Sequence, residues 1–245
     1  MAALLLLAFL TVAGAPASGG SELRPEAFAQ AAFDDGAARL EARGVDIRRG
    51  APVSSVRRSP LIAEVRAQGG DWEGFDDVVF ATHSDDALGI LADATAAERD
   101  ALSAIRYQPN RAILHADPAM MPKRRRCWSS WVYTEGPEGA GERIGLTYWM
   151  NSLQPIPMDD PMFVTLNPTR PIREDLIYDE VTFAHPVYDT AALAAQAKVR
   201  AMNGTNRTWF CGAWMKDGFH EDGLSSAVDV AAAVERADMR LLAAE

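Results

Sequence analysis

The sequence predicts an α+β (mixed α/β) fold from three observations. Apolar residues recur at helical spacing towards both ends of the chain. The middle third is instead rich in β-branched and aromatic residues separated by prolines, a pattern typical of an antiparallel sheet. The chain then closes with a short strand followed by a long alanine-rich helix. Its 245 residues, 48% of them hydrophobic, suffice for one large domain or two small ones.

The first elements are a helix, several short strands and a helical pair. Residues 25–44 predict a helix, because Pro25 suits its first turn and Gly44 its end. Residues 84–105 predict two helical segments, the first capped by Ser84. Short strands are expected at residues 45–48, 53–57, 61–66 and 75–81, with a turn at Gly69 and Gly70 before the last of them.

The remaining elements are a run of strands and then a helix–strand–helix ending. Strands are expected in the middle third at residues 112–115, 127–133, 144–150 and 163–166. The ending consists of a helix at residues 191–202, a strand at 208–213 and a helix at 224–242. The sequence contains no internal repeat that would suggest a solenoid or a propeller.

Charge and composition exclude several classes of partner. With 24 Lys+Arg against 34 Asp+Glu, the net charge of −10 repels phosphate backbones, so no nucleic acid is expected. No apolar run reaches the roughly 20 residues that a membrane-spanning helix needs. The histidines share no metal-ligand spacing, so no metal site is expected. Cys127 and Cys211 lack a CxxC spacing and are expected to be buried free thiols.

The first residues form a short apolar block at positions 4–10, followed by small-residue triplets at 13–15 and 15–17. Such a segment is similar to a secretory signal, although no Lys or Arg precedes it. The alternative is a buried segment at the edge of a longer protein. A signal would imply a secreted or periplasmic protein. We favour the second interpretation, and with it a cytoplasmic location.

One dense basic run stands out in this acidic chain. It consists of Lys123, Arg124, Arg125 and Arg126. Neighbouring guanidinium and ammonium groups can bind a carboxylate or phosphate head group. The alternative, which we favour from the sequence alone, is a solvated loop before the strand at Cys127, and both interpretations stay open.

The segment from Trp209 to Ala227 carries the most specific pattern. It predicts a buried strand that ends at Gly212, a loop, and a helix that begins near Asp222 or Gly223. The two glycines leave room for a flat ligand to approach the backbone. The free N–H groups of a helix start favour negative charge, such as that of a reduced flavin. An ordinary strand–loop–helix connection is the alternative.

This segment resembles the C-terminal flavin motif of the amine oxidase, phytoene desaturase and protoporphyrinogen oxidase superfamily. More closely, it is similar to the bacterial NAD/FAD-binding amine-oxidase-like proteins found beside cyclopropane-fatty-acid synthases. The stretches that carry the resemblance follow the family's order and lie at residues 75–83, 114–117, 121–122, 128–131, 146–151, 166–168, 185–187 and 218–223. The resemblance implies a partial FAD-dependent amine-oxidase-like fold, with an antiparallel substrate-domain sheet and a closing strand–helix of the FAD domain.

The resemblance also implies which residues contact FAD. Val53 matches the position at the adenine. Gly212 and Ala213 match the strand end beside the ribityl chain and pyrophosphate, although Ala213 replaces the usual acidic residue. Three residues match the helix start under the isoalloxazine ring, namely Asp222, Gly223 and Leu224.

The resemblance assigns domains as well. Residues 1–24 are the apolar N-terminal segment, residues 25–82 with 204–245 are the remainder of the FAD-binding domain, and residues 83–203 are similar to the substrate domain. The G-x-G-x-x-G motif that opens the family is absent. The chain is therefore expected to be a C-terminal portion that needs a separate upstream Rossmann half to hold FAD firmly.

The implied activity is an FAD-dependent oxidoreductase that removes a hydride from a C–H bond of a lipid or fatty-acyl substrate. The basic run would then anchor the head group of that substrate. Candidates for positions near the flavin are His220, Tyr148, Trp149 and His185, and no spacing assigns a catalytic base among them. The alternative is a catalytically inactive remnant, or an exported module that binds an apolar ligand without a cofactor.

Overall fold

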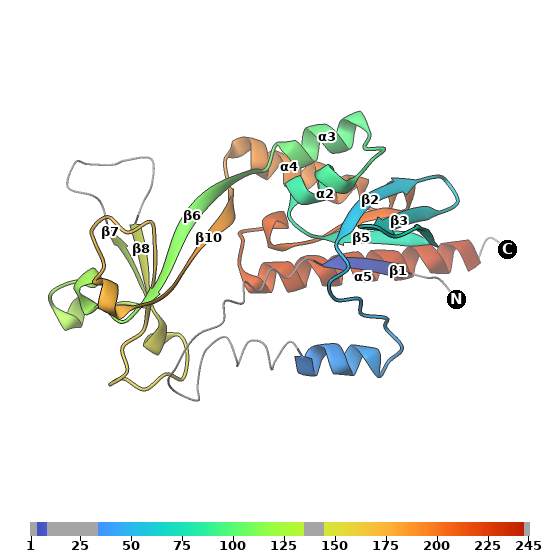
Figure 1. Ribbon diagram of the computed structural model, residues 1–245. Helices are drawn as coiled ribbons and strands as arrows, with labels where there is room; N and C mark the ends of the chain where they lie inside the picture. Colours follow the sequence, from blue (N-terminus) through green and yellow to red (C-terminus); the bar gives the residue numbers. More distant parts are fainter. Residues whose placement is uncertain (1–3, 9–33, 135–144, 243–245) are drawn as a thin grey trace. The chain divides into compact units, whose positions relative to one another are not determined.

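The computed structural model describes residues 4–8, 34–134 and 145–242, and Figure 1 labels their elements. The chain divides into two compact units. The first unit combines the segments before residue 105 and after residue 192, and the second unit spans Ile105–Ala192. The boundaries expected from sequence, after residue 82 and before residue 204, would instead place the helices between Ser84 and Ser103 with the second unit.

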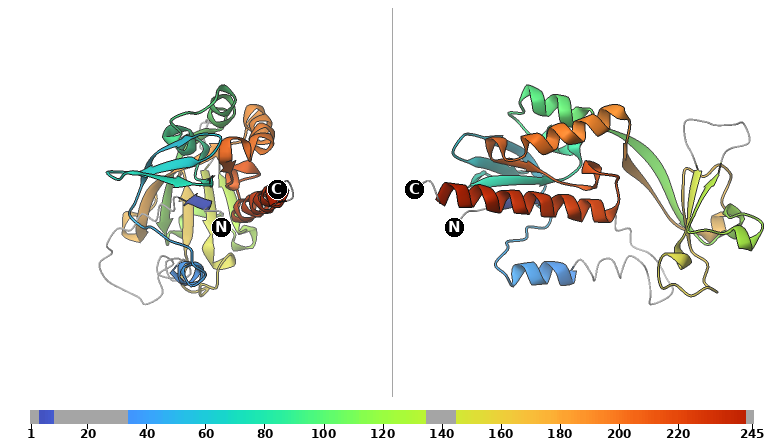
Figure 2. Two further views of the ribbon diagram at one scale, coloured as in Figure 1. Left: turned by 90° about the vertical axis from the view of Figure 1, so that its right-hand side faces the viewer. Right: turned by 180° about the vertical axis from the view of Figure 1, so that it is seen from behind.

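A parallel sheet lies at the centre of the first unit. Its strands run in the order β1 (Leu4–Ala8), β5 (Asp77–Ala81) and β11 (Thr208–Phe210), with both neighbouring pairs parallel. Part of the apolar block at residues 4–10 is thus a strand paired with β5. On one face of the sheet, Val79 and Trp209 pack against Val230 of α5 (His220–Leu242), which runs beside the sheet in Figure 2. Phe80 and Phe210 stack on the other face, with ring centroids 5.3 Å apart.

The first unit also contains a small antiparallel sheet and several helices. The strands are β2 (Val53–Arg58), β3 (Ala63–Ala67) and β4 (Trp72–Phe75), and the helices are α2 (Ser84–Ile90), α3 (Ala96–Ser103) and the greater part of α4 (Thr190–Met202). A further helix covers residues 34–41, and residues 25–33 of the expected helix lie outside the described residues. The strand expected at residues 45–48 does not form, because this segment pairs with no described strand.

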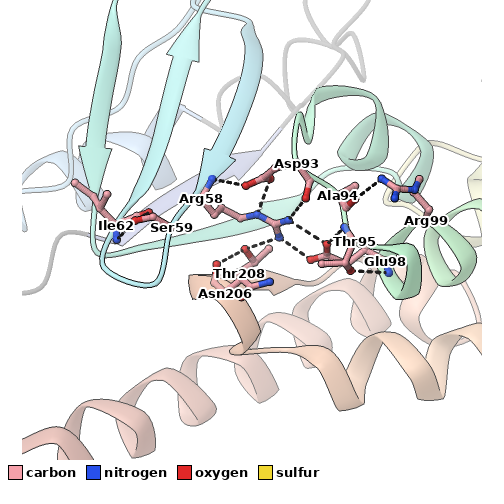
Figure 3. A network of polar contacts seen from close by, with 10 residues as sticks. All are labelled: Arg58, Ser59, Ile62, Asp93, Ala94, Thr95, Glu98, Arg99, Asn206 and Thr208. Atoms are coloured by element: carbon pink, nitrogen blue, oxygen red, sulfur yellow. Dashed lines mark hydrogen bonds and ion pairs between the residues drawn. The ribbon is translucent and has the colours of Figure 1, made fainter.

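A buried arginine joins β2, α3 and β11 within the first unit (Figure 3). The Arg58 side chain is only 2% exposed, and its Nη1 and Nη2 donate to the two carboxylate oxygens of Glu98 at 2.6 and 3.0 Å. Nε donates to Asp93 at 2.9 Å, and Nη1 also lies 3.1 Å from the hydroxyl of Thr208. Glu98 in turn accepts the backbone N–H of Thr95 and closes a capping box at the start of α3. The network fixes the position of β11, whose far end leads into the candidate site.

The second unit is a five-stranded antiparallel sheet. The strand order is β10-β6-β9-β8-β7, and every neighbouring pair is antiparallel. Its strands are β6 (Arg106–His115), β7 (Trp131–Thr134), β8 (Gly145–Trp149), β9 (Phe163–Leu166) and β10 (Ile177–Val187). The antiparallel sheet predicted for the middle third is confirmed, although β10 was not foreseen.

Short 3-10 helices connect these elements. They are η1 (Pro118–Met120), η2 (Arg125–Cys127), η3 (Met150–Ser152), η4 (Glu174–Leu176), η5 (Thr205–Arg207) and η6 (Ala213–Met215). Cys211 is buried as expected, but the expectation is wrong for Cys127, which is exposed. Cys127 closes the η2 turn instead of opening a strand, so it stays at the surface. None of the helices in the described part of the chain is long and apolar enough to cross a bilayer.

Candidate functional site

The residues singled out from sequence fall in both units. The first unit holds the predicted cofactor contacts and one flavin-side candidate, namely Val53, Gly212, Ala213, His220, Asp222, Gly223 and Leu224. The second unit holds the other candidates and the basic run, namely Lys123, Arg124, Arg125, Arg126, Tyr148, Trp149 and His185. The two groups are therefore considered separately.

The carboxyl edge of the parallel sheet is the centre of the first group. Open parallel sheets bind ligands beyond the carboxyl ends of their strands. β5 ends at Ala81 and β11 at Phe210, and Cys211 extends the ladder by donating its N–H to the carbonyl of Phe80 at 3.0 Å. The next residues, Thr82 and Gly212, therefore lie at the same edge.

Gly212 is held by both its conformation and its hydrogen bonds. Its φ is +149°, and a Cβ added there would lie 2.7 Å from Nε1 of Trp214. The buried Ser226 hydroxyl of α5 accepts the Gly212 N–H at 2.8 Å. The same oxygen lies 3.1 Å from the carbonyl oxygen of Gly212 and 2.8 Å from that of Gly223. Ser226 thus fastens the end of β11 to the first turns of α5.

Further hydrogen bonds hold the η6 turn after Gly212 in place. The indole N–H of Trp214 donates to the carbonyl of Thr82 at 2.9 Å, which ties the turn to the end of β5. From α4, the amide of Gln196 donates to the carbonyls of Trp214 and Lys216 at 3.0 and 2.7 Å. Bonds from two helices and one strand therefore hold this short loop in a single geometry.

Two backbone N–H groups at this turn have no acceptor among the described residues. They are the N–H groups of Ala213 and Trp214. Consecutive backbone N–H groups without an acceptor are suited to bind an anion. The turn lies at the carboxyl edge of the sheet, where a phosphate-bearing ligand would be expected.

The start of α5 differs from the sequence prediction. The helix begins at His220, so the prediction of a start near Asp222 or Gly223 is wrong. The Gly223 N–H donates to the carbonyl of Phe219 at 3.2 Å and is not free. Asp222 accepts the Phe219 N–H at 3.0 Å and, with Glu221, places negative charge in the first turn. These carboxylates already compensate the positive helix end, so the better anion donors lie at η6.

The structure brings together three of the six predicted cofactor residues. A Cβ on Gly223 would lie 3.6 Å from the backbone nitrogen of Ala213, so α5 approaches the η6 turn closely beside Gly212. Leu224 is 60% exposed. Val53 lies on β2 in the separate antiparallel sheet of the same unit. Their roles at a cofactor stay predictions.

Other polar groups lie close to this edge. His220 is exposed as the first residue of α5. His83, Asp85 and Asp86, at the start of α2, form the one group of potential metal ligands found in the described residues. Such exposed acidic groups are common at helix starts, where they compensate the helix dipole. We therefore assign no metal-binding role to this group.

The sheet of the second unit has a packed face and an open face. Cross-strand partners point to the same face, so Tyr148 shares one face with its partners Trp131 and Val164. His185 lies on that face too. It is four residues after Val181 on β10, so the two side chains share a face, and Val181 pairs with Ala112 of β6. The half-buried or exposed apolar and aromatic side chains of this open face are Leu114, Trp131, Tyr133, Leu146, Tyr148, Val164, Leu166, Val181 and Phe183, and its polar side chains include Gln108, Asn110, Asp179 and His185.

The open face is apolar and aromatic over β7, β8 and β9, and its polar groups gather on β6 and β10. The side-chain Nδ2 of Asn110 lies 2.9 Å from Nδ1 of His185, so the two side chains are joined by a hydrogen bond. Burial, together with Tyr133, raises the pKa of the Tyr148 hydroxyl. Tyr148 therefore stays protonated at neutral pH and can donate a hydrogen bond to a ligand.

The packed face holds a buried histidine that the sequence did not single out. Nδ1 of His115 accepts the Asp117 N–H at 3.0 Å, and Nε2 lies 2.7 Å from the hydroxyl of Thr165. This pattern makes Nε2 the protonated nitrogen. Burial lowers the pKa of His115 to about 4, with Asp117 acting in the opposite direction. His115 is therefore a neutral core residue stacked on Phe163, with ring centroids 5.5 Å apart.

Trp149 lies on the packed face, unlike its neighbour Tyr148. Its ring meets the edge of Trp128 at 5.2 Å, and the guanidinium of Arg125 lies over both rings, 4.5 Å from Trp128 and 5.4 Å from Trp149. All four residues of the basic run are exposed. Within the described part of the chain, no carboxylate forms an ion pair with any of them.

Solved structures share this architecture. A CLA-producing fatty acid isomerase from P. acnes matches with a TM-score of 0.54 at 18% identity, over 82% of this chain and 50% of that chain. A protein from Exiguobacterium sp. 255-15 assigned as a protoporphyrinogen oxidase matches with a TM-score of 0.51 at 12% identity, over 83% and 51%. An A394C mutant of putrescine oxidase reaches a TM-score of 0.49 at 14% identity, over 79% and 51%.

The chain spans about half the length of these solved structures. No family model matches the sequence, and no curated protein matches it. At these identities the likeness concerns the fold, which agrees with the sheets, helices and order of elements expected from sequence. The chain therefore has a partial FAD-dependent amine-oxidase-like fold.

Proposed function

We propose that this chain is the C-terminal part of an FAD-dependent oxidoreductase that removes a hydride from a C–H bond of a lipid or fatty-acyl substrate. The observation that supports it most is the fastened turn at the carboxyl edge of β11, where Gly212 is followed by two backbone N–H groups that have no acceptor among the described residues. A bound flavin would supply the hydride-accepting chemistry, and the protein would orient it.

The residues at this edge fit a phosphate-bearing cofactor. The N–H groups of Ala213 and Trp214 would donate to pyrophosphate oxygens, as backbone nests do. Ala213 carries no charge, so it does not repel a phosphate. Ser226, Gln196 and the indole of Trp214 would hold the turn in place before the cofactor arrives. Such preorganisation lowers the entropic cost of binding. An upstream Rossmann half would complete the site.

The open face of the second unit would form the substrate wall. Its apolar residues, among them Val164, Leu166 and Phe183, suit an acyl chain. Tyr148 and His185 are the polar groups of this face that we propose orient a substrate near its reacting carbon. Trp149 would act indirectly, by supporting the sheet from its packed face. The basic run Lys123–Arg126 is the proposed anchor for the head group.

An anaerobic titration tests the proposed reaction. The chain would be loaded with FAD, with and without a Rossmann segment from a solved neighbour added as a second chain, and then mixed with oleate. We expect the visible absorbance of oxidised flavin to bleach on addition of oleate. Tight flavin binding without any bleaching by oleate or other acyl lipids would contradict the proposed substrate class.

A second candidate function is an apolar-ligand-binding module without cofactor. The open face is contained within one unit, whereas the chain spans about half the length of its solved neighbours. This candidate predicts that a fluorescent fatty acid binds the chain and that added FAD and Rossmann segment leave this binding unchanged. Flavin bleaching by the acyl substrate would exclude it.

A further inference from the structure

The basic run and the aromatic residues beside it form one continuous surface of the second unit. The indole N–H of Trp128 donates to the carbonyl of Pro122, directly before the run, at 2.8 Å. Arg125 stacks over Trp128, and Trp128 in turn contacts Trp149. These contacts hold the start of the basic run against the end of β8.

An exposed apolar side chain follows this surface along the chain. The N–H of Trp149 donates to the carbonyl of Ser130 at 2.9 Å, and the hydroxyls of Ser130 and Ser152 lie 3.0 Å apart. Leu153, the residue after Ser152, is 46% exposed, whereas Trp131 points to the open face with Tyr148. We call this surface the basic end and define it by Lys123, Arg124, Arg125, Arg126, Trp128 and Leu153.

From this juxtaposition we infer that the basic end docks on the surface of a bilayer that contains anionic lipids. Four adjacent exposed cations, with no ion-pair partner among the described residues, stand out in a chain of net charge −10. Four cations can bind more negative charge than a single carboxylate head group carries. The many phosphates at the surface of an anionic bilayer supply that charge. The half-buried Trp128 under Arg125 and the exposed Leu153 suit the interfacial region of the bilayer.

This inference goes beyond the proposed reaction and does not depend on the cofactor. Docking would place the basic end where an acyl substrate resides, and single lipid molecules could then reach the open face. A protein that binds only a dissolved acyl carboxylate would show no preference for a charged surface. The two sources of negative charge are therefore separable by experiment.

Vesicle co-sedimentation of the full chain tests the inference. The probes are vesicles of phosphatidylcholine alone and vesicles of equal parts phosphatidylcholine and phosphatidylglycerol, at low and raised salt. The test variant combines Lys123→Ala, Arg124→Ala and Arg126→Ala and keeps the stacked Arg125. The control variant removes three exposed cations of the first unit that already pair with carboxylates, through Arg48→Ala, Arg57→Ala and Lys198→Ala.

We expect the wild type and the control variant to sediment with the anionic vesicles at low salt and not with the neutral ones. The test variant should bind at least about tenfold more weakly, since each cation near an anionic surface contributes about fivefold. Circular dichroism would establish that both variants are folded. A test variant that unfolds would be replaced by Arg124→Glu alone, for which we expect a loss of about fivefold or more.

Three outcomes would overturn the inference. The wild type could fail to sediment with either kind of vesicle. The control variant could lose as much affinity for anionic vesicles as the test variant, which would show that binding depends on the net charge of the chain and not on the basic end. Finally, the test variant could lose binding of dissolved decanoate while its vesicle binding is unchanged, which would assign the basic run to a single head group.

Discussion

The hydroxyl of Ser226 contacts both polar backbone groups of Gly212. It accepts the Gly212 N–H at 2.8 Å and lies 3.1 Å from the Gly212 carbonyl oxygen. Because Ser226 is on α5 and Gly212 ends the last strand of the parallel sheet, this contact sets the distance between the helix and the candidate cofactor turn.

The Ser226→Ala variant should lose about 1 kcal/mol of unfolding free energy, because the half-buried N–H of Gly212 loses the buried Ser226 hydroxyl as its acceptor. Urea unfolding followed by circular dichroism measures this loss. Ser225→Ala is the matched control, since Ser225 contacts Lys216 and not Gly212. Equal stability of the two variants would show that the contact does not fasten the turn.

Replacing only one partner of the Arg58–Glu98 ion pair should strongly lower the free energy of unfolding. Replacing Arg58 by Met leaves the Glu98 carboxylate, whose side chain is 6% exposed, without its main partner. We expect a loss of about 3–5 kcal/mol in unfolding free energy. The double variant Arg58→Met with Glu98→Gln should lose less than the sum of the two single variants, as a double-mutant cycle would detect. Additive losses would contradict direct coupling of the two side chains.

His115 should make stability depend on pH. Burial lowers its pKa to about 4 in the folded state, against about 6.5 in the unfolded chain. Between these values the unfolded state binds more protons, so the free energy of unfolding falls as pH falls, by at most about 3 kcal/mol across the window. Urea unfolding at several pH values measures the slope.

Replacement of His115 by Gln should flatten that slope, because glutamine keeps a donor and an acceptor but does not titrate. His220→Gln is the matched control, since it makes the same substitution at an exposed histidine outside this core. A proton magnetic resonance titration that places the His115 pKa near its ordinary value would contradict the buried neutral state.

The two faces of the second sheet should respond differently to substitution. Tyr148→Ala, on the open face, should weaken the binding of a fluorescent fatty acid several-fold and lower stability by no more than about 1 kcal/mol. Trp149→Ala, on the packed face, should cost about 2 kcal/mol or more, because it removes the contact with Trp128. Fluorescence titration and urea unfolding of both variants measure these effects. If the two variants weakened fatty-acid binding equally, the claim that the ligand binds the open face and not the packed face would be contradicted.

Local patterns in the sequence were sufficient for most elements. β9 lies at the predicted residues 163–166, where a short run of apolar and β-branched residues is bounded by Pro161 and Pro168. β10 was not predicted because Asp179, Glu180 and Pro186 interrupt its apolar pattern. It is an edge strand, where proline and charged residues are tolerated, and its partner residues in β6 all lie more than sixty residues earlier.

The site was harder to predict because its contacts are distant in sequence. Gly212 was identified from the local motif, but Ser226 was not, since a serine inside a helix gives no signal until the helix packs on the strand. The burial of His115 depends on Thr165, fifty residues away. Gly223 suggested a helix start, whereas Asp222 and Phe219 extend α5 back to His220.

FAD binding by the cofactor turn is the central claim, and equilibrium dialysis of the full chain against FAD tests it most directly. Wild type is compared with Gly212→Val, which inserts a side chain against Trp214, and with Gly89→Ala on α2, whose added methyl meets no atom within 4 Å. Ser226→Ala, which loosens the same turn, is a second test variant in case the Gly212→Val chain does not fold. We expect saturable, weak binding by wild type and Gly89→Ala, and a clear loss in the other two variants. No saturable binding by wild type, or binding that Gly212→Val and Ser226→Ala leave intact, would contradict a cofactor site at Gly212 to Trp214.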